Sequence, residues 1–469
     1  MKKIIYDKIL SICKWAILSI LFLFMIIILS RILTQQVLVK GLDLDNKLIR
    51  IVGFGRNAQD ISIDVLKSEI VGNDENNMEW ELEYPFHSNS SSKFEEIERV
   101  ISKYEEKIIS RKENLEFYTT ESLFGKSVFE KIGEKYNDLI GWNLATSQGD
   151  LIFLENGYLT NKVEKVADEE IAELVESVDS LYTFVKQKDI DFLYVNAGSK
   201  VCPYDKQLPY GCEEYTNENA DALLTGLSEE KIPYLDLRDE MISDNLDWYN
   251  AYYQTDHHWK TSTGLWAAGK IAETLNERYE YSFDLGLFDE KSYEILEYPD
   301  LWLGGQGRVV GFEYAKKEAY ERILPLYTTD YTVEIPSEKY CAHGDYSETM
   351  FKQDLLEDVL SYSDTEILKM PDAYHCSRFN NNDLARIYNN SNTKNDGKKI
   401  LILQDSFSWY LTSFLASDIE QIDIITCDKF DGSIQTYIEK TNPDMVLVMY
   451  CARNITPVEW THRHMFDFR

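Results

Sequence analysis

The last third of the chain alternates between short apolar runs and segments whose apolar residues recur at helical spacing. From Lys398 onward the order is strand, helix, strand, helix, strand, in KKILILQ, SFSWYLTSFLASD, QIDIITC, GSIQTYIEKTN and DMVLVMYCA. Strands this apolar are typical of a parallel sheet whose two faces are both covered by helices. The pattern therefore predicts an α/β domain.

A similar alternation occupies residues 150 to 275. GDLIFLENGYLT predicts a hairpin that turns at Asn156-Gly157, a pair that favours tight turns between strands. A helix follows over Ile171 to Val185, then strands in IDFLYVNAGSK and IPYLDLRDE. A second helix contains Leu265 to Leu275, and Thr261 or Ser262 can cap its start.

Two further regions complete the predicted organisation. Only Ser19 interrupts the apolar run from Trp15 to Leu29, and with Ile9 to Cys13 this run reaches the roughly 20 residues that span a bilayer. No small residues suited to cleavage follow, which favours a signal anchor with its basic end in the cytoplasm. We expect a cytoplasmic tail at 1–8, a transmembrane anchor at 9–34, an extracellular stem and helical region at 35–149, and the α/β domain at 150–469, with an insertion at about 285–395.

Charge and cysteine content narrow the function. The net charge of −33 argues against nucleic acid, whose phosphates are bound by basic surfaces. Cys202 and Cys212 bracket the proline-rich loop CPYDKQLPYGC, and we expect them to form a disulfide. No cysteines have the CxxC spacing of a structural zinc site, and we assign neither a metal nor a cofactor.

Candidate chemistry lies in two short motifs. In ILILQDSFSWYL a buried strand ends at Gln404, and Ser406 opens the next helix, where open α/β sheets place their sites and backbone N–H groups can stabilise an oxyanion. A serine nucleophile needs a histidine base with an orienting acceptor. In TDHHW, Asp256 and His258 supply both, since residues two apart lie on one side of an extended segment. His257 would then point away, and Trp259 would form a wall of the pocket.

These residues alone leave alternatives open. Aspartate and serine are also ordinary helix N-caps, so the Asp405-Ser406 junction is weak evidence when taken by itself. Asp-His-His is equally compatible with a metal site.

TDHHW, followed by GLWAA and by a later strand–DSF–helix junction, resembles the DHHW family of bacterial membrane-anchored proteins. That family is SGNH-hydrolase-like and similar to the alginate O-acetyltransferases of bacterial cell envelopes. The resemblance covers about residues 150 to 455 and includes the order Asp256, His258, Ser406. VNAGSKVCPYDKQLP resembles the family's lysine–proline loop, LGGQG its glycine loop and NPDMVLVMY its closing strand. Gln404 departs from the usual glycine, and the arginine often seen in the strand after the serine helix is not evident in QIDIITCDKF.

The resemblance implies an SGNH-hydrolase-like parallel sheet with helices on both faces. It implies a membrane protein, with the bulk of the chain extracellular, that O-acetylates a cell-surface polysaccharide through an acyl-serine intermediate. A membrane-bound O-acyltransferase is the expected acyl donor. The further candidates for substrate binding or an oxyanion hole are Lys200, Asn196, Gly305, Gln404 and Trp259.

Three other functions remain compatible with the sequence. An esterase that removes such acyl groups would use the same residues. A catalytically inactive glycan-binding or scaffold protein would keep its function after Ser406→Ala. A metal-dependent hydrolase would lose bound metal in His257→Ala and His258→Ala.

Overall fold

The computed structural model describes residues 151–312, 314–380, 382–391, 393–456 and 465–469. The predicted tail, transmembrane anchor, stem and helical region therefore lie outside the described residues. Within those residues, no helix combines the length and the apolar character needed to cross a bilayer.

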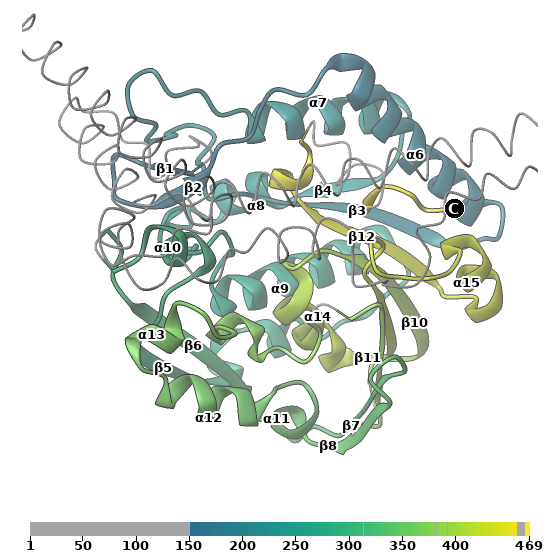
Figure 1. Ribbon diagram of the computed structural model, residues 1–469. Helices are drawn as coiled ribbons and strands as arrows, with labels where there is room; N and C mark the ends of the chain where they lie inside the picture. The colour runs from purple at the N-terminus through teal and green to yellow at the C-terminus, as the bar shows by residue number, and fades with distance from the viewer. Residues whose placement is uncertain (1–150, 313, 381, 392, 457–464) are drawn as a thin grey trace, which may run out of the picture. The chain divides into compact units, whose positions relative to one another are not determined.

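An eight-stranded mixed sheet forms the centre of the described chain (Figure 1). Its spatial order is β4-β3-β12-β10-β11-β9-β7-β8. The five strands from β4 to β11 are parallel, whereas β9, β7 and β8 each pair antiparallel with the preceding strand of that order. The strands span Asp191–Ala197 (β3), Tyr234–Asp236 (β4), Tyr331–Ile335 (β7), Tyr340–Gly344 (β8), Leu384–Asn389 (β9), Asn395–Gln404 (β10), Ile419–Ile425 (β11) and Met445–Cys451 (β12). The sheet is thus parallel only in part, and the expectation of a parallel sheet is corrected to a mixed one.

Helices cover both faces of this sheet, as the apolar strands predicted. Alternate residues of β10 face opposite layers: Ile400 and Ile402 pack with one set of helices, and Leu401 and Leu403 with the other. The first set is α8 (Leu237–Ser243), α9 (Thr261–Arg278) and α14 (Ser408–Leu415); the second is α6 (Asp168–Lys186), α7 (Thr216–Glu229) and α15 (Ile434–Thr441). All seven residues of β12 are buried, because it lies between two neighbours and under both layers.

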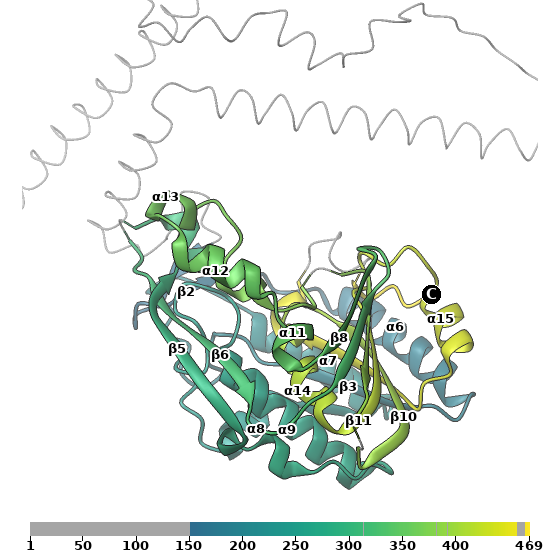
Figure 2. The ribbon, with the colours of Figure 1, turned by 90° about the horizontal axis from the view of Figure 1, so that it is seen from below.

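Smaller elements surround the sheet (Figure 2). Two antiparallel pairs stand apart from it: β1 with β2, which is the hairpin predicted around Asn156-Gly157, and β5 with β6. The remaining elements are β1 (Leu151–Phe153), β2 (Leu159–Asn161), β5 (Tyr293–Trp302), β6 (Glu318–Pro325), α10 (Gly305–Val310), α11 (Tyr346–Thr349), α12 (Gln353–Ser361), α13 (Asp364–Ile367) and the 3-10 helices η2 (Leu285–Phe288), η3 (Glu290–Ser292), η4 (Ala373–Cys376), η5 (Ala416–Asp418) and η6 (Ala452–Asn454). Between residues 285 and 395 the chain thus adds a separate strand pair and also contributes β7, β8 and β9 to the main sheet.

Two local expectations are corrected. The strand in IPYLDLRDE is only three residues long, because Asp236 ends β4 and its carboxylate caps α8 by accepting from the Arg238 N–H at 3.1 Å. Neither Thr261 nor Ser262 caps α9. The Ser262 N–H instead donates to the Glu321 carboxylate of β6 at 3.1 Å.

The expected Cys202–Cys212 disulfide is also wrong for this structure. Every cysteine among the described residues is a free thiol. Cys202 is buried in the apolar core, whereas Cys212 is only half-buried. The two ends of the loop therefore lie in different environments.

Candidate active site

Ser406 lies in a tight turn at the carboxyl end of β10, two residues before α14 begins. The side chain of Asp405 holds this turn. Its Oδ1 accepts from the Phe407 N–H at 2.9 Å, and its Oδ2 accepts from the Cys451 N–H and from Asn454 Nδ2, both at 2.6 Å. Burial raises the pKa of Asp405 to about 6, although these hydrogen bonds and Arg453 oppose the rise. Asp405 therefore fixes the serine turn to the end of the neighbouring strand β12.

Asp256 and His258 lie in a bend between two bridged residues, Tyr252 and Trp259. The bend is closed by the Asp256 side chain, whose Oδ1 accepts from the His258 N–H at 3.0 Å. The extended segment expected from the sequence is therefore corrected to a compact turn. The side chains of Asp256 and His258 still lie together in this turn, because the Asp256 carboxylate accepts from the backbone N–H of the residue two positions further along.

The structure brings Asp256, His258 and Ser406 into one hydrogen-bonded row. His258 Nδ1 lies 2.5 Å from Asp256 Oδ1, and His258 Nε2 lies 2.7 Å from Ser406 Oγ. An ionised carboxylate can only accept, so Nδ1 carries the ring proton and Nε2 accepts the serine hydroxyl. The row joins segments 148 residues apart in the chain.

Asp256 is buried and has a second partner from α10. The Gly305 N–H donates to its Oδ2 at 2.6 Å, while Gly304, just before the helix, packs against the Asp256 backbone. Burial alone would raise the pKa of Asp256, but His258, His257 and the hydrogen bonds to its carboxylate lower it well below the ordinary value. Asp256 is therefore ionised at neutral pH, as an orienting acceptor must be.

Glu318 of β6 holds the same bend from the other side. Its carboxylate accepts from the Gln254 N–H at 2.7 Å, from the Thr255 N–H at 2.8 Å and from the Thr255 hydroxyl. Burial raises the pKa of Glu318, and these hydrogen bonds together with Lys200 counteract part of that effect. Nothing in the sequence around Glu318 distinguishes it from the many other acidic residues, so sequence reasoning missed it.

Aromatic side chains enclose the imidazole of His258. Tyr374 of η4 stacks on it with ring centroids 3.9 Å apart and an interplanar angle of 13°. Phe407 and Trp409 lie at 5.4 and 5.9 Å. Trp259 does not stack on His258 but donates its Nε1–H to the Phe407 carbonyl at 3.1 Å, so it supports the serine turn. Tyr374, like Glu318, carried no signal in the sequence.

His257 does not point away from the site as expected. Its ring centroid lies 3.8 Å from that of His258, and its Nδ1 lies 3.5 Å from Asp256 Oδ1. Burial and the charge of His258 lower the pKa of His257 well below its ordinary value, so it is neutral at pH 7. The ligand atoms of Asp256, His257 and His258 lie within 4.8 Å of one another, which suits a metal. Both ring nitrogens of His258, however, already have protein partners.

The other predicted residues have structural partners. Lys200 Nζ donates to Leu159 O at 2.6 Å, Gln254 O at 3.1 Å and Gln306 Oε1 at 2.9 Å, and burial lowers its pKa to about 7. Asn196 donates to Asp236 at 2.9 Å. Gln404 is buried and donates to Phe379 O and Thr426 Oγ1, both at 3.2 Å. Lys200 thus ties the β1–β2 hairpin to the bend and to α10.

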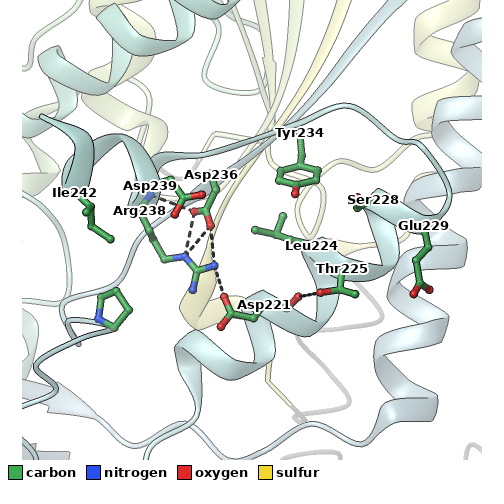
Figure 3. Close-up of a pocket in the computed structure, with 11 residues that line it drawn as sticks. Asp221, Leu224, Thr225, Ser228, Glu229, Tyr234, Asp236, Arg238, Asp239 and Ile242 are labelled. Carbon is green, nitrogen blue, oxygen red and sulfur yellow. Dashed lines mark hydrogen bonds and ion pairs between the residues drawn. The ribbon is translucent and has the colours of Figure 1, made fainter.

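A separate pocket of about 470 Å³ opens beside β4, between α7 and α8 (Figure 3). Arg238 crosses it and forms ion pairs at 2.7 Å with Asp236 and with Asp221. None of Asp256, His258 and Ser406 lines this pocket. Its charged groups connect α7, β4 and α8 through Arg238.

Comparison with known proteins identifies similar folds and one matching family model. Residues 149–294 match the family model described as "SGNH hydrolase-like domain, acetyltransferase AlgX". No curated protein matches the chain. The structure of Bacillus cereus PatB1 with a sulfonyl adduct is similar to this one, with a TM-score of 0.54 and 17% identity over 68% of this chain and 98% of that one. A second structure of Bacillus cereus PatB1 has a TM-score of 0.52 and 18% identity over 68% and 99%.

A DHHW family protein from Eubacterium siraeum is also similar, with a TM-score of 0.48 and 13% identity over 66% of this chain and 93% of that one. At these identities the likeness to PatB1 shows the fold alone. The resemblance predicted from the sequence is confirmed: this chain has an SGNH-like α/β fold, and its residues 149–294 are similar to the SGNH hydrolase-like domain of the acetyltransferase AlgX.

Proposed function

We propose that this protein is an O-acyltransferase that moves an acetyl group to a hydroxyl of a cell-surface glycan. The observation that carries the proposal is the position of His258, with one ring nitrogen 2.5 Å from Asp256 and the other 2.7 Å from Ser406. The similarity of residues 149–294 to the acetyltransferase AlgX supports the choice of reaction. We further propose that residues 9–34 anchor the chain in the cell membrane with the α/β domain outside.

The first half-reaction acylates Ser406. Its Oγ attacks the acyl carbonyl of the donor while the hydroxyl proton moves to His258 Nε2. Asp256 stabilises the resulting imidazolium through Nδ1–H. The tetrahedral intermediate collapses, and the leaving group departs with the proton from Nε2. The products are an acetyl ester on Ser406 and a neutral His258.

The second half-reaction regenerates the serine. An acceptor hydroxyl attacks the acyl carbonyl and gives its proton to His258 Nε2. The bond from carbon to Ser406 Oγ then breaks, and Oγ takes the proton back. When water replaces the glycan hydroxyl, the same steps make the protein an esterase, so the acceptor decides between the two activities.

The direct test is the intact mass of the purified full-length protein after exposure to p-nitrophenyl acetate and, separately, to phenylmethylsulfonyl fluoride. The PatB1 structure with a sulfonyl adduct makes the second reagent a suitable probe. We expect one adduct with each reagent in the wild type and none in Ser406→Ala. Ser408→Ala is the matched control, because Ser408 is buried two residues further along.

A folded wild type that forms neither adduct would contradict the proposal and favour a non-catalytic glycan-binding protein. Adducts that persist in Ser406→Ala would assign the chemistry to another residue. Metal that copurifies with the wild type and is lost in His257→Ala would favour the metal-dependent hydrolase.

A further inference from the structure

A second aspartate–histidine pair lies at the start of η4, where Asp372 precedes the helix and His375 is part of it. His375 Nδ1 is 2.6 Å from Asp372 Oδ1, and the Asp372 side chain is buried while that of His375 is 37% exposed. Asp372 also caps η4 by accepting from the His375 N–H at 3.3 Å. A cap accounts for the aspartate, but it does not require the imidazole to turn back onto the same carboxylate.

The short helix α10 fixes both aspartate–histidine pairs. At its start the Gly305 N–H donates to Asp256, and one turn later Arg308 Nη2 lies 3.0 Å from Asp372 Oδ2. Arg308 is itself held by its Nε–H, which donates to Leu303 O at 3.0 Å. The two carboxylates are therefore set relative to each other by one rigid element.

Aromatic rings connect the second pair to the reacting atoms. Tyr374, next to His375 in the chain, stacks on His258 and donates its hydroxyl to Ser406 O at 3.3 Å. The ring of Trp409 lies 5.6 Å from His375 and 5.9 Å from His258. His375 and His258 therefore both lie against the ring of Trp409, which connects the second pair to the first.

The chemistry of the pair favours a ligand that donates a hydrogen bond. Asp372 can only accept, so Nδ1 of His375 carries the proton and Nε2 is left as an acceptor. Among the described residues, the His375 ring has one hydrogen-bond partner, Asp372 at Nδ1, and its Nε2 has none. An acyl carbonyl offers only acceptor atoms and cannot bind there, whereas an alcohol offers an O–H.

We propose that His375, oriented by Asp372 and Arg308, binds a hydroxyl group of the acceptor glycan during the second half-reaction. The acceptor donates one O–H to Nε2 of His375 and presents a different hydroxyl to the acyl group on Ser406. His375 exchanges no proton, and the transferred proton goes to His258 as described above. This inference rests on the proposed acyl transfer and assigns its acceptor site to a carbohydrate or another polyol.

The test measures the two half-reactions separately in the full-length protein. The burst of p-nitrophenol from p-nitrophenyl acetate reports acylation. The increase in acyl-enzyme breakdown with added glycerol, methyl β-glucopyranoside or cellotetraose reports acceptor use. Loss of one neutral hydrogen bond predicts that His375→Ala lowers the acceptor-dependent rate constant for the polyols about tenfold and leaves the burst within about twofold.

Matched variants separate binding from support of the fold. His375→Gln keeps an acceptor oxygen and is expected to recover part of the acceptor-dependent rate. His343 is another exposed histidine. It lies on the edge strand β8, and its Nε2 is 3.5 Å from Asp330 Oδ1, so His343→Ala should change neither half-reaction. Equal losses in the burst and in acceptor use for His375→Ala would overturn the proposal, because His375 would then act only through Tyr374.

The remaining outcomes are also decisive. If His375→Ala left the acceptor-dependent rate constant unchanged, the proposal that His375 binds the acceptor would be wrong. A wild-type acyl-enzyme that none of the three alcohols accelerates would also overturn it. A wild type that forms no acetyl adduct at Ser406 by intact mass would instead refute the acyl-serine mechanism itself, which distinguishes failure of the proposed function from failure of this inference.

Discussion

Gly304 offers the sharpest test of how Asp256 is held. An alanine methyl at this position would lie 2.3 Å from Asp256 Cβ and 2.7 Å from its Cα and N. Carbon atoms pack at about 3.5–4.0 Å, so α10 and the bend would have to separate by more than about 1 Å. That movement breaks the 2.6 Å hydrogen bond from the Gly305 N–H to Asp256 Oδ2.

The expected cost follows from these distances. Overpacking of this kind costs about 1–3 kcal/mol of stability. A misplacement of about 1 Å in a catalytic group costs about 100-fold in rate. We therefore expect Gly304→Ala to lower kcat/KM for p-nitrophenyl acetate about 100-fold, with a fall of a few degrees in Tm.

The assay pairs ester hydrolysis with thermal unfolding followed by circular dichroism. Gly264→Ala is the control. Gly264 lies in α9 near the same site, and an alanine methyl group there would meet its nearest neighbours at 3.7 Å, which is an ordinary contact distance. If Gly304→Ala kept the wild-type rate and Tm, the close approach of α10 to Asp256 would not be what holds the carboxylate.

Three further outcomes are expected. Asp256→Asn should lower kcat about 10⁴-fold, because an amide favours the wrong tautomer of His258; a loss below tenfold in ester hydrolysis would remove Asp256 from the mechanism. The pKa of Asp405 is raised from 3.8 to about 6, so this group contributes up to about 3 kcal/mol of stability that is present below pH 3.8 and lost as the pH rises through 6. Asp405→Asn should flatten the pH dependence of Tm between pH 4 and 7.5, and an unchanged slope would contradict this. Lys200→Met should lower the free energy of unfolding by about 3 kcal/mol, because three oxygens, two of them buried, lose their donor. Urea unfolding would measure this loss, and Lys188→Met, at an exposed ion pair with Glu439, should cost under about 1 kcal/mol.

Much of the fold followed from the sequence because its signals are local. The apolar runs and helical spacings gave the strands β3, β10, β11 and β12 and the helices between them. Asp256, His258 and Ser406 could be paired because each lies beside a strand or helix boundary that the pattern located. The strand β9 was not predicted, since it lies in the region expected to be an insertion, and its place beside β11 depends on pairing with a partner strand rather than on its own residues.

The supports of the site were hidden for the same reason. Gly305 was expected at an oxyanion hole, but its N–H holds Asp256, and only the approach of α10 reveals this. Lys200 and Gln404 form buried hydrogen bonds with residues far from them in the sequence, Gln306 and Phe379, and local patterns do not reveal such partners. The orientation of His257 depends on the turn that the Asp256 carboxylate makes with the His258 N–H. In the extended segment expected from the sequence, side chains alternate, and this pattern predicted the wrong direction for His257.

The position of β12 in the sheet has a consequence for biosynthesis. Among the strands that the structure describes, β12 is synthesised last, yet it lies between β3 and β10. Until it arrives, β3 and β10 each present an open hydrogen-bonding edge flanked by apolar side chains, the kind of surface that recruits other chains. Chains cut short before Met445 should therefore aggregate and depend on chaperones, because the sheet is completed only after β12 has been synthesised.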